Sequence, residues 1–264
     1  MIRADTANLQ SLSSQSDTAT IINLKDRNIH MIKQDLILCN PLRKISSETD
    51  DVIPEGGFGA VLAPAGVGKT ALLVQLALNA MLRSKKVLHI SLQDPVGKVS
   101  LWYQELFHHL AKQAQLQQVN QLWESILHNR FILTFKVEGF SVPRLEERLT
   151  DLITQDIFHP QMMIMDGLRF DESGRQPLSD LKALAAKHGM RTWFTVHTHR
   201  HEQPDPDGWP LQLLHVADLF DMVLALQPKG SEIHIKPLQG SATVPDDLPL
   251  LLDPSTMLIK EDNH

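Results

Sequence analysis

The stretch "APAGVGKTA", residues 63–71, decides how this chain folds. It follows the short apolar run "GAVLA" at 59–63 and leads into "KTALLVQLALNAMLRS" at 69–84, where apolar residues recur at helical spacing. A glycine-rich turn between a strand and a helix points successive backbone N–H groups at an anion, and the helix N-terminus adds partial positive charge. The stretch therefore predicts a buried strand, a phosphate-binding turn and a helix.

Residues in this turn have distinct expected roles. The eight residues from Ala63 to Thr70 fit the pattern G-x-x-x-x-G-K-[ST], with alanine at the first glycine. We expect Lys69 to contact the β and γ phosphates and Thr70 to offer its hydroxyl to Mg²⁺. The expected cofactor-binding residues are Ala63, Pro64, Ala65, Gly66, Val67, Gly68, Lys69, Thr70 and Ala71. The alternative interpretation is a glycine-rich turn that binds no ligand.

A second acidic signal lies downstream in "QMMIMD", residues 161–166, where four apolar residues precede Asp166. Ligands of open α/β sheets bind at the carboxyl ends of the parallel strands, which is where Asp166 would lie. Alone, such an aspartate merely ends a strand. Together with the turn at 63–70 it predicts a Mg²⁺ site formed by Thr70 and Asp166.

Strand patterns and helix patterns alternate along the middle of the chain. Expected strands cover 59–63, 86–92, 130–135, 161–166 and 191–197, and expected helices cover 69–84, 96–115, 119–127, 141–156 and 177–189. Consecutive strands are then expected at 219–227, 231–238 and 256–260. This order predicts an α/β fold with a mainly parallel, twisted sheet flanked by helices and antiparallel strands at the C-terminal end. We expect one domain at 51–264, preceded by an N-terminal arm at 1–50 whose first 20 residues are a mobile tail.

Composition limits the partners and the location. The formal net charge of −6 gives no general attraction to nucleic acid or to an anionic membrane, although a local basic groove stays open. Cys39 is the single cysteine, so no intrachain disulfide forms, in keeping with a reducing compartment. The N-terminus has no apolar signal core, and no apolar run reaches the roughly 20 residues that span a bilayer. We therefore expect a cytoplasmic protein with no membrane segment.

The chain resembles the RecA-like P-loop ATPases, in the branch that holds DnaB-type replicative helicases and KaiC-like proteins. The resemblance is strongest in "GFGAVLAPAGVGKTALLVQLALNAMLRSKKVLHISLQD" and continues through "MMIMDGL", "WFTVHTHR", "VADLFDMVLAL" and "EIHIKPLQGS". It covers roughly residues 55–240. The resemblance implies a RecA-type core that binds ATP and Mg²⁺ at its edge.

The chain departs from this family at the positions that drive hydrolysis. Gln93 stands where the family usually places a glutamate that orients the attacking water, and Asp94 follows it. His197 stands where the family has a polar sensor of the γ-phosphate. Leu238 stands where the family often presents an arginine finger, and Arg169, Arg175 or Arg200 could replace it. We assign Lys69, Asp166, Gln93, Asp94 and His197 as candidate catalytic residues.

These departures favour a particular function over its rivals. We expect an ATP-binding protein, or a weak Mg²⁺-dependent ATPase, that uses its nucleotide state to control assembly or a protein partner. The expected partners are ATP or ADP, further copies of this chain or another protein, with nucleic acid not favoured. The alternatives are a nucleic-acid motor or recombination ATPase, a P-loop small-molecule kinase, and a nucleotide-stabilised scaffold without turnover. A metal site formed by His197 and His199 is a lesser alternative to a solvated loop.

Overall fold

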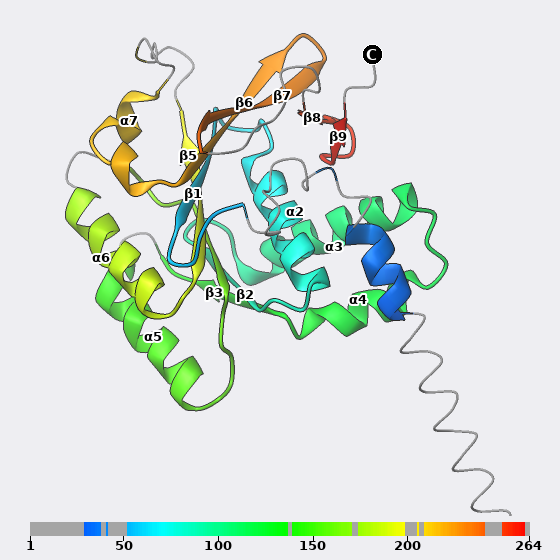
Figure 1. Ribbon diagram of the computed structural model, residues 1–264, viewed down its shortest axis with the longest axis horizontal. Helices are drawn as coiled ribbons and strands as arrows, with labels where there is room; N and C mark the ends of the chain where they lie inside the picture. Colours follow the sequence, from blue (N-terminus) through cyan, green and yellow to red (C-terminus); the bar gives the residue numbers. More distant parts are fainter. Residues whose placement is uncertain are drawn as a thin grey trace, which may run out of the picture.

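A computed structural model of the chain shows a single twisted sheet with helices on both faces (Figure 1). It describes residues 29–37, 41, 52–136, 139–170, 174–198, 205, 209–240 and 250–261. The strands are β1 (Phe58–Ala63), β2 (Val87–Ser91), β3 (Arg130–Thr134), β4 (Met162–Asp166), β5 (Arg191–His197), β6 (Met222–Lys229), β7 (Glu232–Gln239), β8 (Leu250–Leu252) and β9 (Ile259–Glu261). The helices are α2 (Lys69–Leu82), α3 (Val96–Gln113), α4 (Val119–Leu127), α5 (Val142–Thr154), α6 (Arg175–Lys187) and α7 (Leu211–Leu214).

The order of the strands across the sheet is β3-β2-β4-β5-β1-β6-β7-β8-β9. The pairs from β3 to β6 are parallel, whereas β7, β8 and β9 are added antiparallel. β5 lies between β1 and β4, with His197 paired to Ala63 and Phe194 paired to Met165. Because parallel strands share an edge at their carboxyl ends, the residues that follow β1, β4 and β5 meet there. This confirms the predicted fold class.

Alternation of side chains along the strands builds a core on each face of the sheet. In β1, Val61 and Ala63 face the core that contains α2, α3 and α4, whereas Phe58, Ala60 and Leu62 face the core that contains α5 and α6. All six residues of β1 are buried, as expected for a parallel strand covered on both faces. Figure 1 shows the helices divided in the same way, with α2, α3 and α4 on one side and α5 and α6 on the other.

Part of the expected N-terminal arm packs on the domain itself. Residues 29–37 form a helix, and its Leu36 and Ile37 are buried in the core on the α2 side. The expected mobile tail, residues 1–20, lies outside the described residues.

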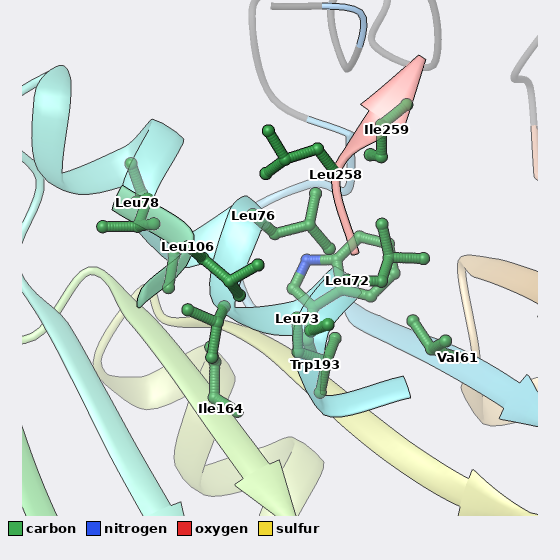
Figure 2. Packing of buried hydrophobic residues seen from close by; sticks show 14 of the residues in the cluster. Val61, Leu72, Leu73, Leu76, Leu78, Leu106, Ile164, Trp193, Leu258 and Ile259 are labelled. Carbon is green, nitrogen blue, oxygen red and sulfur yellow. The ribbon is translucent and has the colours of Figure 1, made fainter. Parts of the chain in front are cut away.

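The C-terminal strands are fastened to α2 by a buried glutamine. The Gln75 side chain donates to the carbonyl of Met257 (2.7 Å) and accepts from the backbone N–H of Ile259 (2.9 Å). Figure 2 shows Leu258 and Ile259 reaching the same core as Leu72, Leu76 and Trp193. The amide satisfies two backbone groups at the point where the last strand begins, so the end of the chain is fixed over the helix that follows the 63–70 turn.

Several element predictions differ from the structure at the C-terminal end. The strand predicted at 219–227 begins only at Met222, because Ala217–Leu219 form a 3₁₀ turn. The strand predicted at 256–260 is shorter and later, at Ile259–Glu261, and strand β8 was missed altogether. Three residues give too short a pattern to read from sequence. α7 is also short and was not predicted, because its apolar residues follow a loop rich in Pro and Asp.

The five predicted helices are present, and their ends lie within two residues of the predicted ones. Ser141 precedes α5 and Pro143 lies in its first turn, as predicted, but the Ser141 side chain makes no capping hydrogen bond. α6 begins at Arg175, two residues before the predicted start at Pro177. Gly189 ends that helix with φ 63. Among the helices of the described segments, none is long and apolar enough to cross a membrane.

Replacing Gln75 with Leu should destabilise the protein by about 2–4 kcal/mol, because the carbonyl of Met257 and the N–H of Ile259 would stay buried without a partner. Urea unfolding followed by circular dichroism measures the loss. Gln104→Leu on the exposed face of α3 is the matched control and should change the free energy of unfolding by less than about 0.5 kcal/mol. Equal effects of the two variants would contradict the fastening role.

Candidate active site

The turn after β1 has the backbone geometry that its sequence predicts. Gly66 has φ 78 and Gly68 has φ 107, both in the left-handed region. A Cβ on Gly68 would lie 2.5 Å from Cδ2 of Leu252 in β8, so a larger residue there meets both backbone strain and a packed neighbour. The turn closes directly onto α2, whose first hydrogen bond runs from the N–H of Leu72 to the carbonyl of Gly68 (3.0 Å). Its free N–H groups therefore surround one point at the helix N-terminus.

Lys69 is held at the mouth of this turn. Its Nζ donates to the carbonyls of Ala63 and Pro64, each at 2.8 Å. Burial lowers the pKa of the Lys69 ammonium to about 8, and the negative charge of Asp166 works in the opposite direction. The side chain is thus a partly desolvated cation whose two carbonyl partners can be exchanged for anionic oxygens.

Asp166 is held between two hydroxyl groups from different elements. Thr70 donates to its Oδ2 (3.0 Å) and Thr195 donates to its Oδ1 (2.7 Å). Burial raises the pKa of the Asp166 carboxyl above its usual value, the two hydrogen bonds oppose that rise, and the charge of Asp94 adds to it. Thr195 also accepts from the N–H of Gly167 (3.0 Å), so one hydroxyl fixes both the carboxylate and the chain that leaves β4.

A cavity of about 550 Å³ opens over these residues. Ala65, Gly66, Lys69 and Thr70 form its side at the turn, and β4 and β5 contribute Asp166, Thr195 and His197. The remaining lining residues are Gln93, Gly167, Leu168, Arg169, Phe170, Val196 and Gln212. The other predicted turn residues support the cradle from behind, since the side chains of Ala63, Val67 and Ala71 belong to the buried core.

Of the two candidates after β2, Gln93 is the one that lines the cavity. Its side chain lies against Gly167, where an added Cβ would come within 2.8 Å of Cγ of Gln93. Asp94 instead pairs with Lys98 on α3 at 2.9 Å, while its backbone N–H bonds to the hydroxyl of Ser91. Asp94 influences the site through its charge, and Gln93 offers an amide to it.

The arginines that could replace a finger are placed differently from one another. Arg169 lines the cavity. Arg175 makes a two-pronged pair with Asp218, both contacts at 2.8 Å, and is thereby held to the 3₁₀ turn after α7. Arg200 lies outside the described residues. Leu238 packs with its apolar side chain against the core on the α5 side.

Thr195 and Gly167 are site residues that the sequence analysis missed. Thr195 sits inside the apolar strand pattern "RTWFTVH", so nothing in the local sequence separates it from a buried β-branched residue. The strand order would have identified Thr195, because the carboxyl half of β5 lies next to Asp166 once β5 is placed between β1 and β4. The alternative metal cluster of His197 and His199 is not tested, since residue 199 is outside the described part. Among the described residues, no group of three or more His, Cys, Asp or Glu side chains could hold a metal ion.

The residues present fit a nucleotide with Mg²⁺. A hydroxyl and a carboxylate oxygen 3.0 Å apart, Thr70 Oγ1 and Asp166 Oδ2, supply the hard oxygen ligands that Mg²⁺ prefers. The glycine turn, its helix N-terminus and the Lys69 ammonium supply the positive side for phosphates. Together they define a P-loop nucleotide-binding protein of the α/β class.

Comparison with known families agrees with a P-loop nucleotide-binding protein and identifies the family. Residues 34–203, more than half of the chain, match the AAA_25 family, described as an AAA domain. The chain belongs to this family of P-loop ATPase domains. No curated protein matches it.

ATP affinity should fall with rising pH in the range set by Lys69. Because the free protein loses the Lys69 proton near pH 8 and the phosphates require the ammonium, Mg·ATP should bind roughly tenfold more weakly at pH 9 than at pH 7. Isothermal titration calorimetry at the two pH values measures this. Lys69→Ala should bind weakly at both, and an unchanged wild-type affinity would exclude Lys69 as the titrating phosphate ligand.

Thr195→Val should weaken Mg²⁺ dependence without removing nucleotide binding. The change leaves Asp166 Oδ1 and the N–H of Gly167 without the hydroxyl, so the carboxylate loses its orientation. We expect the Mg²⁺ concentration for half-maximal ATP binding to rise about 10–100-fold, the range seen when partners of metal ligands are removed. Thr195→Ser keeps the hydroxyl and should stay within about threefold. Equal behaviour of Val and Ser would show that only packing matters.

Proposed function

We propose that this protein binds Mg·ATP in the cavity over the 63–70 turn, hydrolyses it slowly, and uses its nucleotide state to control assembly or a protein partner. The observation that carries the proposal is Gln93 in the cavity wall, with Asp94 paired to Lys98. Mg²⁺, when bound, neutralises phosphate charge. Lys69 would bind the phosphates and Asp166 would hold the metal.

Slow hydrolysis follows from the chemistry of the Gln93 side chain. An amide orients a water molecule by hydrogen bonds but cannot take its proton as a carboxylate does. The carboxylate of Asp94 forms an ion pair with Lys98 in the first turn of α3. A protein with such a site would hold ATP for long periods, which suits a switch more than a motor.

The distribution of arginines supports the same conclusion. Leu238, at the expected finger position, packs in the core and offers no charge. Arg169 lines the cavity of its own subunit but does not stand at the sequence position of the family's finger. An arginine finger can be worth about 10³–10⁵ in rate, so its loss would by itself leave a weak ATPase. From the sequence resemblance, we infer that this chain lies in the branch of DnaB-type and KaiC-like proteins.

Gln93→Glu tests the proposal most directly. Supplying a general base at the cavity wall should raise ATP turnover by about 10²–10⁴-fold, the usual contribution of general-base catalysis. Phosphate release with excess Mg·ATP measures the rate. Gln104→Glu, which adds a carboxylate on the exposed face of α3, is the control and should leave turnover unchanged. Lys69→Ala should abolish turnover.

The outcomes separate the candidates. Fast wild-type turnover that Gln93→Glu does not raise would overturn the slow-hydrolysis proposal. Mass photometry with ATP, with ADP and without nucleotide tests the assembly role, which predicts a change in oligomer between nucleotide states. Turnover stimulated by single-stranded DNA in a salt-dependent manner would instead favour the nucleic-acid motor.

A further inference from the structure

A second cavity of about 430 Å³ lies beside the nucleotide cavity. It is bounded by the N-terminal ends of α5 and α6, which lie side by side on one face of the sheet (Figure 1). Its lining residues are Leu92, Phe140, Ser141, Val142, Pro143, Leu168, Arg169, Gly174, Pro177, Leu178, Asp180 and Leu181. Of these residues, Leu92 follows β2, and Leu168 and Arg169 follow β4.

The wall chemistry of this cavity suits an apolar molecule. Its deepest walls are aliphatic: Leu92, Leu178 and Leu181 are each less than 5% exposed. Phe140 and Val142 are half-buried at its rim. A volume of about 430 Å³ falls within the range of pockets that bury small molecules. An apolar body of two or three rings would remove these side chains from water on binding.

One end of the cavity is positive. Arg169 is exposed at that end and makes no hydrogen bond or ion pair to the described residues in the structure. The first turns of α5 and α6 also face the cavity, and neither has a side-chain cap. Asp180 is the acidic residue among the described lining residues, and its carboxylate, which accepts from the side chain of Gln176 at 2.8 Å, would repel an anion. An anionic group on the ligand would therefore be placed toward Arg169.

Two residues belong to both cavities. Leu168 and Arg169, which follow Asp166 and Gly167, line the nucleotide cavity and the second cavity alike. A ligand that moves Arg169 changes the electrostatic potential at the nucleotide phosphates and so the affinity for the nucleotide. By linkage, the nucleotide must change the affinity for that ligand by the same factor.

We propose that the cavity between the N-terminal ends of α5 and α6 binds a small apolar molecule carrying one anionic group, and that Arg169 couples its binding to nucleotide binding. The coupling rests on the proposed function, whereas the binding site itself stands on the second cavity. Through this site, a metabolite of this class would change the affinity of the protein for its nucleotide.

A matched pair of fluorescent probes tests the site. 1-Anilinonaphthalene-8-sulfonate has an apolar body and a sulfonate, and N-phenyl-1-naphthylamine has the same body without the charge. Both should bind the wild-type protein without nucleotide. Arg169→Gln should weaken the sulfonate probe by about threefold to tenfold and leave the neutral probe within about twofold, since only the former contacts the guanidinium.

Filling the cavity tests its location. Val142→Trp takes up the space at the rim and should weaken both probes by at least about tenfold. Leu101→Ser, which removes an exposed leucine on α3, is the control and should change neither. Thermal melts identify a variant that fails to fold. If Val142→Trp fails to fold, Arg169→Gln still tests the site, because residue 169 is exposed.

The outcomes distinguish this inference from the proposed function. Saturating Mg·ATP should shift the affinity of the sulfonate probe in the wild type but not in Lys69→Ala, which should still bind both probes. Probe binding without any effect of nucleotide would retain the site and remove the coupling. Probe binding that persists in Val142→Trp, or that is lost in Leu101→Ser, would overturn the site.

Discussion

The carboxylate of Asp166 is the constraint on which the site depends. It is largely withdrawn from water, and hydroxyl groups from α2 and from β5 hold its two oxygens. Those two elements can reach it only because β5 lies between β1 and β4. A desolvated carboxylate without partners would be costly, so strand order, hydroxyl placement and carboxylate charge are mutually dependent. The phosphate turn and the expected metal ligand are therefore one structural unit.

The other end of the chain supports this unit from behind. Gln75 fastens β9 to α2, and Leu252 of β8 lies where a side chain on Gly68 would collide with it. The antiparallel strands thus do more than extend the sheet. Leu258 and Ile259 also pack with Leu72 and Leu76 of α2 in one buried cluster (Figure 2).

Opposite the phosphate turn, the described residues offer the nucleotide cavity an amide and a guanidinium. Gln93 offers an amide, Asp94 is paired with Lys98, and Leu238 is packed in the core. The segment after β4 then carries Arg169 from the nucleotide cavity into a second, largely aliphatic one. Under the proposed function, a site arranged in this way would hold ATP without hydrolysing it quickly, as a nucleotide-dependent switch requires.

The sequence by itself determined the elements whose signals are local. The turn at 63–70, the helix after it and the apolar strand ending in Asp166 each depend on backbone preference and on a short pattern of burial, and the structure places them as predicted. Tertiary structure decided everything that depends on neighbours distant in the chain. In the sequence, Thr195 resembles a core residue, and its contact with Asp166 forms only because β5 lies beside β4. Likewise, only the bend of the chain after β2 decides that Gln93 lines the cavity and Asp94 does not. Strand β8 and the cavity shared through Arg169 likewise exist only once remote segments pack together, because no local pattern encodes which surfaces meet.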